Sequence, residues 1–221
     1  MAGESLESVV LDLRGLPGDR WFAVEDAHGH FASGKSTRRF RRRDPIFNYA
    51  AATHDGHVFV RRADRTWAVG DPALDAELSS AMGLAVRVTA EGEVSHQDAG
   101  QVSLVGTASL AWCENQLGID ADPRRLRANI LVDTAEAFVE ETWVGQFVSV
   151  GQARLRVIER IERCRMVDLA QDGVATTTPF LKALGGGRDV RLGVYADVVT
   201  PGRLAVGDPV APLGFAAPTR G

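Results

Sequence analysis

The sequence has few cysteines, no long apolar run and no excess of positive charge. Only two cysteines, Cys113 and Cys164, occur among 221 residues, which argues against a disulfide framework and for a reducing compartment. No apolar run approaches the ~18 residues that a membrane helix needs, and the first residues lack the basic and apolar regions of a signal peptide. A formal net charge of −4 gives no general reason to expect nucleic-acid or membrane binding. We therefore expect a soluble, cytoplasmic protein without nucleic-acid or membrane partners.

Most of the periodicity in the chain is that of β-strands. Apolar and polar residues alternate over residues 153–157 and again, for longer, over residues 190–198, as in strands with one buried face. Residues 26–29 (Asp-Ala-His-Gly) form a turn signal. Residues 57–61 and 66–69 are rich in strand-forming side chains and predict a β-hairpin.

Helix signals are sparse by comparison. Asp71-Pro72 predicts an N-cap followed by proline at the first helical position, and Gly83 predicts the end of that helix. A second helix is expected from Thr107 to Gly118, and a third from Thr178-Pro179 that stops at glycines 185–187. We expect these glycines and residues 171–177 to be mobile loops. Many short strands with a few helices predict an α+β, mainly β, barrel-like fold.

Residues 29–36 (Gly-His-Phe-Ala-Ser-Gly-Lys-Ser) satisfy the phosphate-loop pattern G-x-x-x-x-G-K-[ST]. In a true phosphate loop Lys35 would reach the outer phosphates and Ser36 would bind magnesium. Such a loop must open a sustained helix, but the residues after Ser36 are arginine-rich and lack apolar periodicity as far as Pro45. A nucleotide binder that uses Gly29–Ser36 is therefore a minor alternative.

Five arginines follow this segment and admit two interpretations. They can form a solvated face, or an edge that binds anions, because guanidinium groups match phosphate oxygens in pairs. The arginines are Arg38, Arg39, Arg41, Arg42 and Arg43.

Cys164 is the side chain for which the sequence most clearly indicates a chemical role. It lies in the sequence Ile-Glu-Arg-Cys-Arg, residues 161–165, after a basic strand. Positive neighbours favour the thiolate, which attacks electrophiles or binds a soft metal. A free cysteine is more often a small buried hydrophobe, and Cys113, on the apolar face of the second predicted helix, fits that description.

Six short motifs follow one another along residues 18–213. They are Gly18-Asp19-Arg20-Trp21, Arg125-Leu126-Arg127-Ala128-Asn129, Glu140-Glu141-Thr142-Trp143, Arg163-Cys164, Gly193-Val194-Tyr195 and Val206-Gly207-Asp208-Pro209-Val210. In this order they resemble the MOSC domain family, which occurs at the C-terminus of molybdenum cofactor sulfurases and in the amidoxime-reducing component. Three departures from the family pattern are Leu126 and Ala128, where the family has an aromatic residue and proline, and Ile161, where longer relatives have a cysteine.

The resemblance implies a MOSC-type β-barrel and a division of the chain. Residues 1–92 are expected to form a shortened N-terminal β-barrel region, residues 93–214 the MOSC domain and residues 215–221 a tail. The family's longer members begin with a further strand that helps to hold the cofactor, and we expect this chain to start after it.

The resemblance also implies a molybdenum cofactor, a phosphate-bearing pterin, and a set of residues around it. Cys164 is the expected metal ligand or persulfide carrier, and Asp168 a possible proton donor. Glu140 and Glu141 have a simpler interpretation, as acceptors for backbone amides or arginines. The expected cofactor-binding residues are Arg20, Lys35 and Arg127 for the phosphate, and Asn129, Arg163 and Tyr195 for the pterin.

Three functions follow from this resemblance and stay open at this point. The first is an oxidoreductase that reduces N-hydroxylated or related small molecules at a Cys164-ligated molybdenum, with electrons from a separate donor protein. The second is a metal-free sulfur carrier, sulfurtransferase or C–S bond-processing enzyme that uses a Cys164 persulfide. The third is a non-catalytic binding module for an anionic small molecule. Metal content separates the first from the others.

Overall fold

The computed structural model describes residues 1–97, 99–171, 173–174 and 179–215. In these residues strands β1–β15 predominate over helices α1–α4 and short 3₁₀ helices η1–η3, which confirms the α+β, mainly β fold class. The chain forms two compact units, and both are discontinuous. Unit 1 contains Met1–Ser5, Gly18–His96 and a segment that begins at Cys164, whereas unit 2 contains Leu6–Pro17, Gln97–Arg163 and the C-terminal segment.

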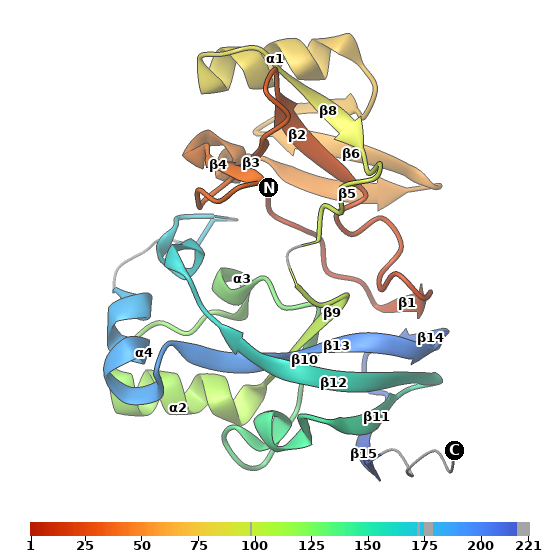
Figure 1. Ribbon diagram of the computed structural model, residues 1–221, viewed down its shortest axis with the longest axis vertical. Helices are drawn as coiled ribbons and strands as arrows, with labels where there is room; N and C mark the ends of the chain where they lie inside the picture. Colours follow the sequence, from red (N-terminus) through yellow and green to blue (C-terminus); the bar gives the residue numbers. More distant parts are fainter. Residues whose placement is uncertain (98, 172, 175–178, 216–221) are drawn as a thin grey trace. The chain divides into compact units, whose positions relative to one another are not determined.

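Unit 2 is built on a six-stranded sheet in the order β10-β9-β13-β12-β11-β15 (Figure 1). Its neighbouring strands are antiparallel except for β9 and β10, which are parallel. A separate antiparallel pair is formed by β1 and β14. The strands are β1 (Ser8–Leu11), β9 (Val102–Gly106), β10 (Ile130–Val132), β11 (Gln146–Val150), β12 (Ala153–Glu162), β13 (Arg191–Thr200), β14 (Gly202–Ala205) and β15 (Val210–Phe215).

Strand β12 shows the alternation that its sequence predicts. Ala153, Leu155 and Val157 are 2%, 0% and 0% exposed, whereas Arg154 and Arg156 between them are exposed. The buried side chains join the main core of unit 2 with residues of β9, β11 and β13. Burial of this apolar face holds a ten-residue strand whose end leads directly to Cys164.

One helix of unit 2 differs from its prediction. Helix α4 (Phe180–Arg188) does not stop at glycines 185–187 but runs through them, so the expected mobile glycine loop is wrong. Phe180 and Leu184 are both 0% exposed, and burial of this i, i+4 pair outweighs the poor helix propensity of glycine. The predicted start at Thr178 and most of the predicted loop 171–177 lie outside the described residues. The other helices are α2 (Thr107–Leu117), which confirms its prediction, α3 (Pro123–Leu126) and η2 (Val139–Trp143).

Unit 1 contains a four-stranded sheet in the order β4-β3-β2-β8 and a three-stranded sheet in the order β5-β6-β7. Its core includes Tyr49, Val60 and Trp67, with Met166 and Leu169 packed against it. The elements are β2 (Phe22–Asp26), β3 (Phe31–Ser33), β4 (Phe40–Arg42), η1 (Asp44–Asn48), β5 (Ala50–His54), β6 (His57–Arg62), β7 (Arg65–Ala68), α1 (Pro72–Met82), β8 (Val86–Ala90) and η3 (Arg165–Asp168).

Two local predictions for unit 1 are confirmed. The Asp71 carboxylate accepts a hydrogen bond from the Ala73 amide at 2.8 Å, and Gly83 ends α1 with φ of 70°. Leu74 and Leu78 on the inner face of this helix are 0% exposed. Strands β6 and β7 pair antiparallel, as the predicted hairpin requires.

The phosphate-loop match has no phosphate-loop structure. Residues 31–33 are strand β3, and after a turn the chain enters strand β4, which pairs with β3. Within residues 29–43 no helix begins after Ser36, so the helix N-terminus that would bind phosphates is not formed. The structure therefore removes the physical basis for nucleotide binding by Gly29–Ser36.

Asp26 predicts a pH dependence of stability in unit 1. Burial opposes its ionisation, but hydrogen bonds from the His30 and His28 amides, at 3.0 and 2.9 Å, and the His30 ring outweigh burial and lower the pKa of the carboxyl. A lowered folded-state pKa stabilises the fold above the unfolded value of about 3.9, and this stabilisation is lost as the pH falls through the folded-state pKa. We therefore expect Asp26→Asn to reduce the free energy of unfolding at pH 6 and to have little effect near pH 2.

Urea unfolding at both pH values, followed by circular dichroism, measures this difference. Asp64→Asn is the matched control because Asp64 is exposed, and its effect should stay within about 0.5 kcal/mol at either pH. An equal loss for Asp26→Asn at both pH values would contradict the linkage.

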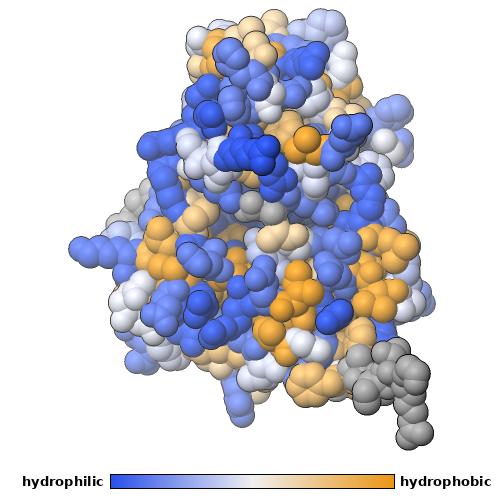
Figure 2. Space-filling model, in the orientation of Figure 1, coloured by the Kyte–Doolittle hydropathy of each residue, from blue (hydrophilic) through white to orange (hydrophobic). Residues whose placement is uncertain are grey.

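In the described part of the chain no helix is long and apolar enough to cross a membrane. Exposed large apolar side chains are concentrated in unit 2, where Figure 2 shows several orange patches separated by polar residues. They include Val10, Leu13, Val206, Leu213 and Phe215.

Candidate functional site

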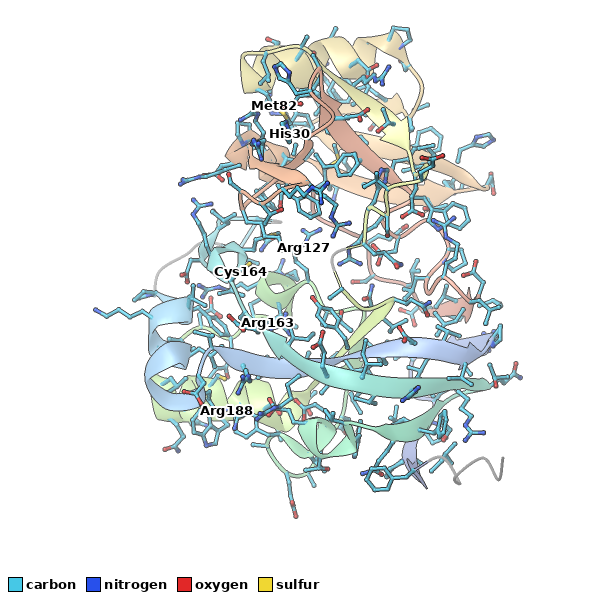
Figure 3. All side chains as sticks on the ribbon, viewed as in Figure 1. His30, Met82, Arg127, Arg163, Cys164 and Arg188 are labelled. Carbon is cyan, nitrogen blue, oxygen red and sulfur yellow. The ribbon has the colours of Figure 1, made fainter. Side chains whose placement is uncertain are left out.

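Cys164 lies two residues after the end of β12, where the chain turns into η3 (Figure 3). Its backbone is extended, with φ of −122° and ψ of 179°, and it is the N-cap residue of η3. The side chain is half-buried, whereas Cys113 on α2 is 0% exposed. Of the two thiols, Cys164 is therefore the one that solvent and a ligand can reach.

Arg163, directly before Cys164, is held by backbone carbonyl groups of unit 2. It is 8% exposed. Its Nε donates to the Leu192 carbonyl at 2.8 Å, and its Nη1 donates to the Leu126 carbonyl at 3.0 Å. The Arg163 amide also donates to the Val190 carbonyl at 2.8 Å. These bonds tie the residue before Cys164 to the start of β13 and to the end of α3.

Arg165, directly after Cys164, is held by two residues of unit 1. Its Nη1 donates to the Gly34 carbonyl at 2.8 Å, and its two terminal nitrogens bind the two carboxylate oxygens of Asp44 at 3.0 Å each. The hydrogen bond from Arg165, together with Arg42, lowers the pKa of the Asp44 carboxyl against the opposing effect of burial. No pattern in the sequence predicts the pairing of Arg165 with Asp44, which lie 121 positions apart. The only available signal was the position of Arg165 beside Cys164.

The remaining predicted residues of unit 1 are Arg20, Lys35 and Asp168. Lys35 follows Gly34, and its Nζ lies 5.4 Å from the centre of the Phe40 ring. Asp168 is the last residue of η3. Arg165 thus brings the segment that contains Lys35 to the turn that contains Cys164 and Asp168. Arg20 lies before β2 with φ of 58° and pairs with the Asp19 carboxylate.

In unit 2 the structure brings Asn129 and Tyr195 together through Ser103. The Asn129 Oδ1 accepts hydrogen bonds from the Ser103 amide at 3.0 Å and from the Ser103 hydroxyl at 2.8 Å. Ser103 lies opposite Tyr195 in the pairing of β9 with β13. Arg127, half-buried and with φ of 54°, ends α3 two residues before Asn129.

Glu140 and Glu141 have the structural roles that were expected of them. Glu140 is 0% exposed, and its Oε1 accepts from the Gly106 amide at 3.1 Å and from the Ser109 hydroxyl at 2.7 Å. The Glu141 Oε2 accepts from Arg188 at 2.5 Å, with Arg160 at 3.8 Å. The acidic pair therefore connects η2 to α2, α4 and β12.

The donor set for a metal is limited in the part of the chain that the structure describes. It contains no group of three or more histidine, cysteine, aspartate or glutamate side chains that could hold a metal ion. Cys164 instead offers one soft sulfur donor. A single soft thiolate suits a metal group that brings its remaining ligands with it.

The two thiols are expected to differ sharply in reactivity. Burial is the main reason why the pKa of Cys113 is raised to about 11, so this thiol is both inaccessible and protonated at pH 8. We expect a disulfide reagent at pH 8 to modify one thiol in the folded protein and the second only after unfolding in urea. Cys164→Ala should abolish the fast phase. Fast modification of Cys113 in that variant would contradict the assignment.

The family model of the MOSC domain matches residues 91–211. The match covers more than half of the chain, which therefore belongs to the MOSC domain family. The matched range contains the Arg163-Cys164 pair, the Glu140-Glu141 pair and the Gly193-Val194-Tyr195 strand.

Two curated relatives carry functional names. Molybdenum cofactor sulfurase from Bos taurus is 33% identical over 96 residues, which cover 40% of this chain and 11% of that protein. Mitochondrial amidoxime-reducing component 1 from Danio rerio is 30% identical over 134 residues, which cover 57% of this chain and 41% of that protein. The chain thus spans less than half the length of either relative.

Two solved structures match this chain at low sequence identity. The YuaD protein from Bacillus subtilis is 15% identical, with a TM-score of 0.48, over 94% of this chain and 85% of that chain. YiiM from Geobacillus stearothermophilus is 17% identical, with a TM-score of 0.40, over 52% of this chain and 54% of that chain.

Proposed function

We propose that this MOSC protein binds a molybdenum cofactor through Cys164 and reduces N-hydroxylated or related small molecules. The observation that carries the proposal is the placement of Cys164. Its half-buried thiol lies at a strand end between two arginines that are each fixed by hydrogen bonds. The likeness to an amidoxime-reducing component supports this substrate class.

In this proposal each residue has a limited task. The Cys164 thiolate would hold the metal, which supplies the two-electron chemistry when it is bound. The cofactor-binding roles of Arg20, Lys35, Arg127, Asn129, Arg163 and Tyr195 stay predictions from the family resemblance. Asp168, on the same 3₁₀ turn as Cys164, is the proposed proton donor. The electrons would come from a separate donor protein.

Elemental analysis tests the proposal directly. We expect near-stoichiometric molybdenum, with pterin fluorescence after oxidation, in protein from a host that makes the cofactor. Cys164→Ala should lose most of the metal. The control is Cys113→Ala, which removes a buried thiol and should keep it. Protein without molybdenum or pterin in any variant would overturn the proposal.

A second candidate, sulfur transfer, uses the same thiol. The likeness to molybdenum cofactor sulfurase favours it. The Cys164 thiolate would attack the outer sulfur of a persulfide donor, whose S–S bond breaks and whose thiolate leaves. An acceptor nucleophile would then attack the outer sulfur of the Cys164 persulfide and regenerate the Cys164 thiolate. Mass spectrometry of the metal-free protein after incubation with a persulfide donor would then show about 32 Da of added mass on Cys164. Cys164→Ala should lack this addition, and an unmodified wild type would exclude this candidate.

A further inference from the structure

We propose that Arg165 and Asp44 form a positioning clamp that holds Cys164 in place, so that the reactivity of the thiol depends on this ion pair between η3 and η1. This inference rests on the proposed function only in treating Cys164 as the reactive residue. Arg165 is not itself assigned contact with substrate or cofactor.

The geometry of the clamp is specific. The two terminal nitrogens of Arg165 each bind a different oxygen of Asp44, at 3.0 Å, and one of them also donates to the Gly34 carbonyl at 2.8 Å. A guanidinium fork that meets both oxygens of one carboxylate fixes direction as well as distance. Lysine, a point charge, cannot reproduce that pattern.

Packing around Gly34 supports the same placement. A Cβ atom on Gly34 would lie 2.4 Å from Leu169 Cδ1 and 3.1 Å from Met166 Cγ. The turn that begins at Cys164 therefore lies directly against the backbone at Gly34. The Ser33 hydroxyl also lies 3.8 Å from the Met166 sulfur. Arg165 adds a directional restraint to this apolar contact, one residue from the thiol.

Because the Arg165–Asp44 ion pair is partly exposed, its effect on the position of Cys164 can be measured apart from any effect on global stability. The side chains of Arg165 and Asp44 are each 37% exposed, and pairs as exposed as this contribute little to global stability. Removal of the clamp should therefore leave the melting temperature nearly unchanged. It should loosen the turn locally, because local opening is governed by the contacts of the segment itself.

The test is the rate of Cys164 alkylation by iodoacetamide in the folded full-length protein, measured from pH 6 to pH 10. At the high-pH plateau the thiol is fully ionised, so the rate no longer depends on the ionised fraction. It reports access to the thiolate and its nucleophilicity, and Arg165→Lys, which keeps the charge, separates these two effects. We expect Arg165→Gln and Asp44→Asn each to raise the plateau rate about fivefold. The double variant should match the single variants instead of multiplying their effects.

Two controls separate the clamp from general effects of charge. Arg42→Gln removes a second partner of Asp44, at 2.8 Å, but leaves the fork between Arg165 and Asp44 intact, and it should behave as wild type. Arg165→Lys keeps the charge without the fork and should resemble Arg165→Gln. Wild-type plateau rates in both Arg165→Gln and Asp44→Asn, or independent effects in the double variant, would overturn the proposal.

The alkylation assay needs no cofactor, which separates this inference from the proposed function. Molybdenum-free protein with the expected alkylation rates would retain the clamp and overturn only the cofactor proposal. If elemental analysis finds molybdenum but the Arg165 and Asp44 variants show wild-type alkylation rates in cofactor-free protein, the cofactor proposal is retained and the clamp is overturned. Melting curves of every variant establish that the rates are those of folded protein.

Discussion

Replacement of Glu140 by alanine is expected to lower the free energy of unfolding by about 2–4 kcal/mol. Glu140 is 0% exposed and accepts hydrogen bonds from the Gly106 amide and the Ser109 hydroxyl, at 3.1 and 2.7 Å. Both partners lie at the start of α2, where amides lack partners within the helix. The substitution leaves buried donors unsatisfied and a cavity in their place.

The carboxyl group also lies where a helix dipole favours negative charge. Gly106, the N-cap of α2, has no side chain that can cap the helix. Glu140 from η2 and Thr134, whose hydroxyl accepts from the Ala108 amide at 3.2 Å, supply the missing acceptors from elsewhere in the chain. We therefore expect the loss of Glu140 to fray the first turn of α2 as well as to open a cavity.

Urea unfolding followed by circular dichroism measures the effect. Glu140→Gln keeps the shape and one acceptor and should cost less than Glu140→Ala. Glu136→Ala is the matched control, because Glu136 is exposed on the preceding loop, and its effect should stay within about 0.5 kcal/mol. Equal effects of the Glu136 and Glu140 substitutions would show that the buried contacts contribute nothing.

The elements that the sequence predicts well are those with local causes. Helix α1 follows from the Asp71 cap, the proline at its first position and the glycine after its end, all within thirteen residues. Strand β12 follows from its period of two. The predicted end of helix α4 at glycines 185–187 was wrong, because glycine disfavours a helix locally. Burial of Phe180 and Leu184 against residues distant in sequence outweighs that preference.

In the candidate site, too, the features with local causes are predicted from the sequence and those that depend on long-range contacts are not. The sequence predicts Cys164 as the reactive thiol and Cys113 as a core residue, because the motif and the helical spacing are local. The anchoring of Arg163 by Leu192 and Leu126 depends on contacts 29 and 37 positions away. The Arg165–Asp44 pair likewise forms only in the folded chain, so no pattern within the motif predicts it.

Gly193→Ala, near the predicted Arg163-Cys164 motif, is expected to lower the free energy of unfolding by about 2–4 kcal/mol. A Cβ atom there would lie 2.6 Å from the Leu104 carbonyl oxygen and 3.0 Å from the Arg163 Nη2, and Gly193 has φ of 77°. The pairing of β13 with β9 places the next residue, Val194, opposite Leu104. The added methyl group must therefore force these strands apart or displace the Arg163 guanidinium.

Gly186→Ala is the matched control, and its effect should have the opposite sign. Gly186 lies within α4, and a Cβ atom there would meet nothing within 4 Å, so alanine should stabilise the helix by about 0.5–1 kcal/mol. Urea unfolding of both variants measures the two effects. If Gly193→Ala is as stable as wild type, the sheet tolerates a displacement at this position, and the glycine of Gly193-Val194-Tyr195 has no steric role. If it is destabilised and Cys164 is also alkylated faster, the close packing at Gly193 also holds Arg163, and through Arg163 it restrains the thiol of Cys164.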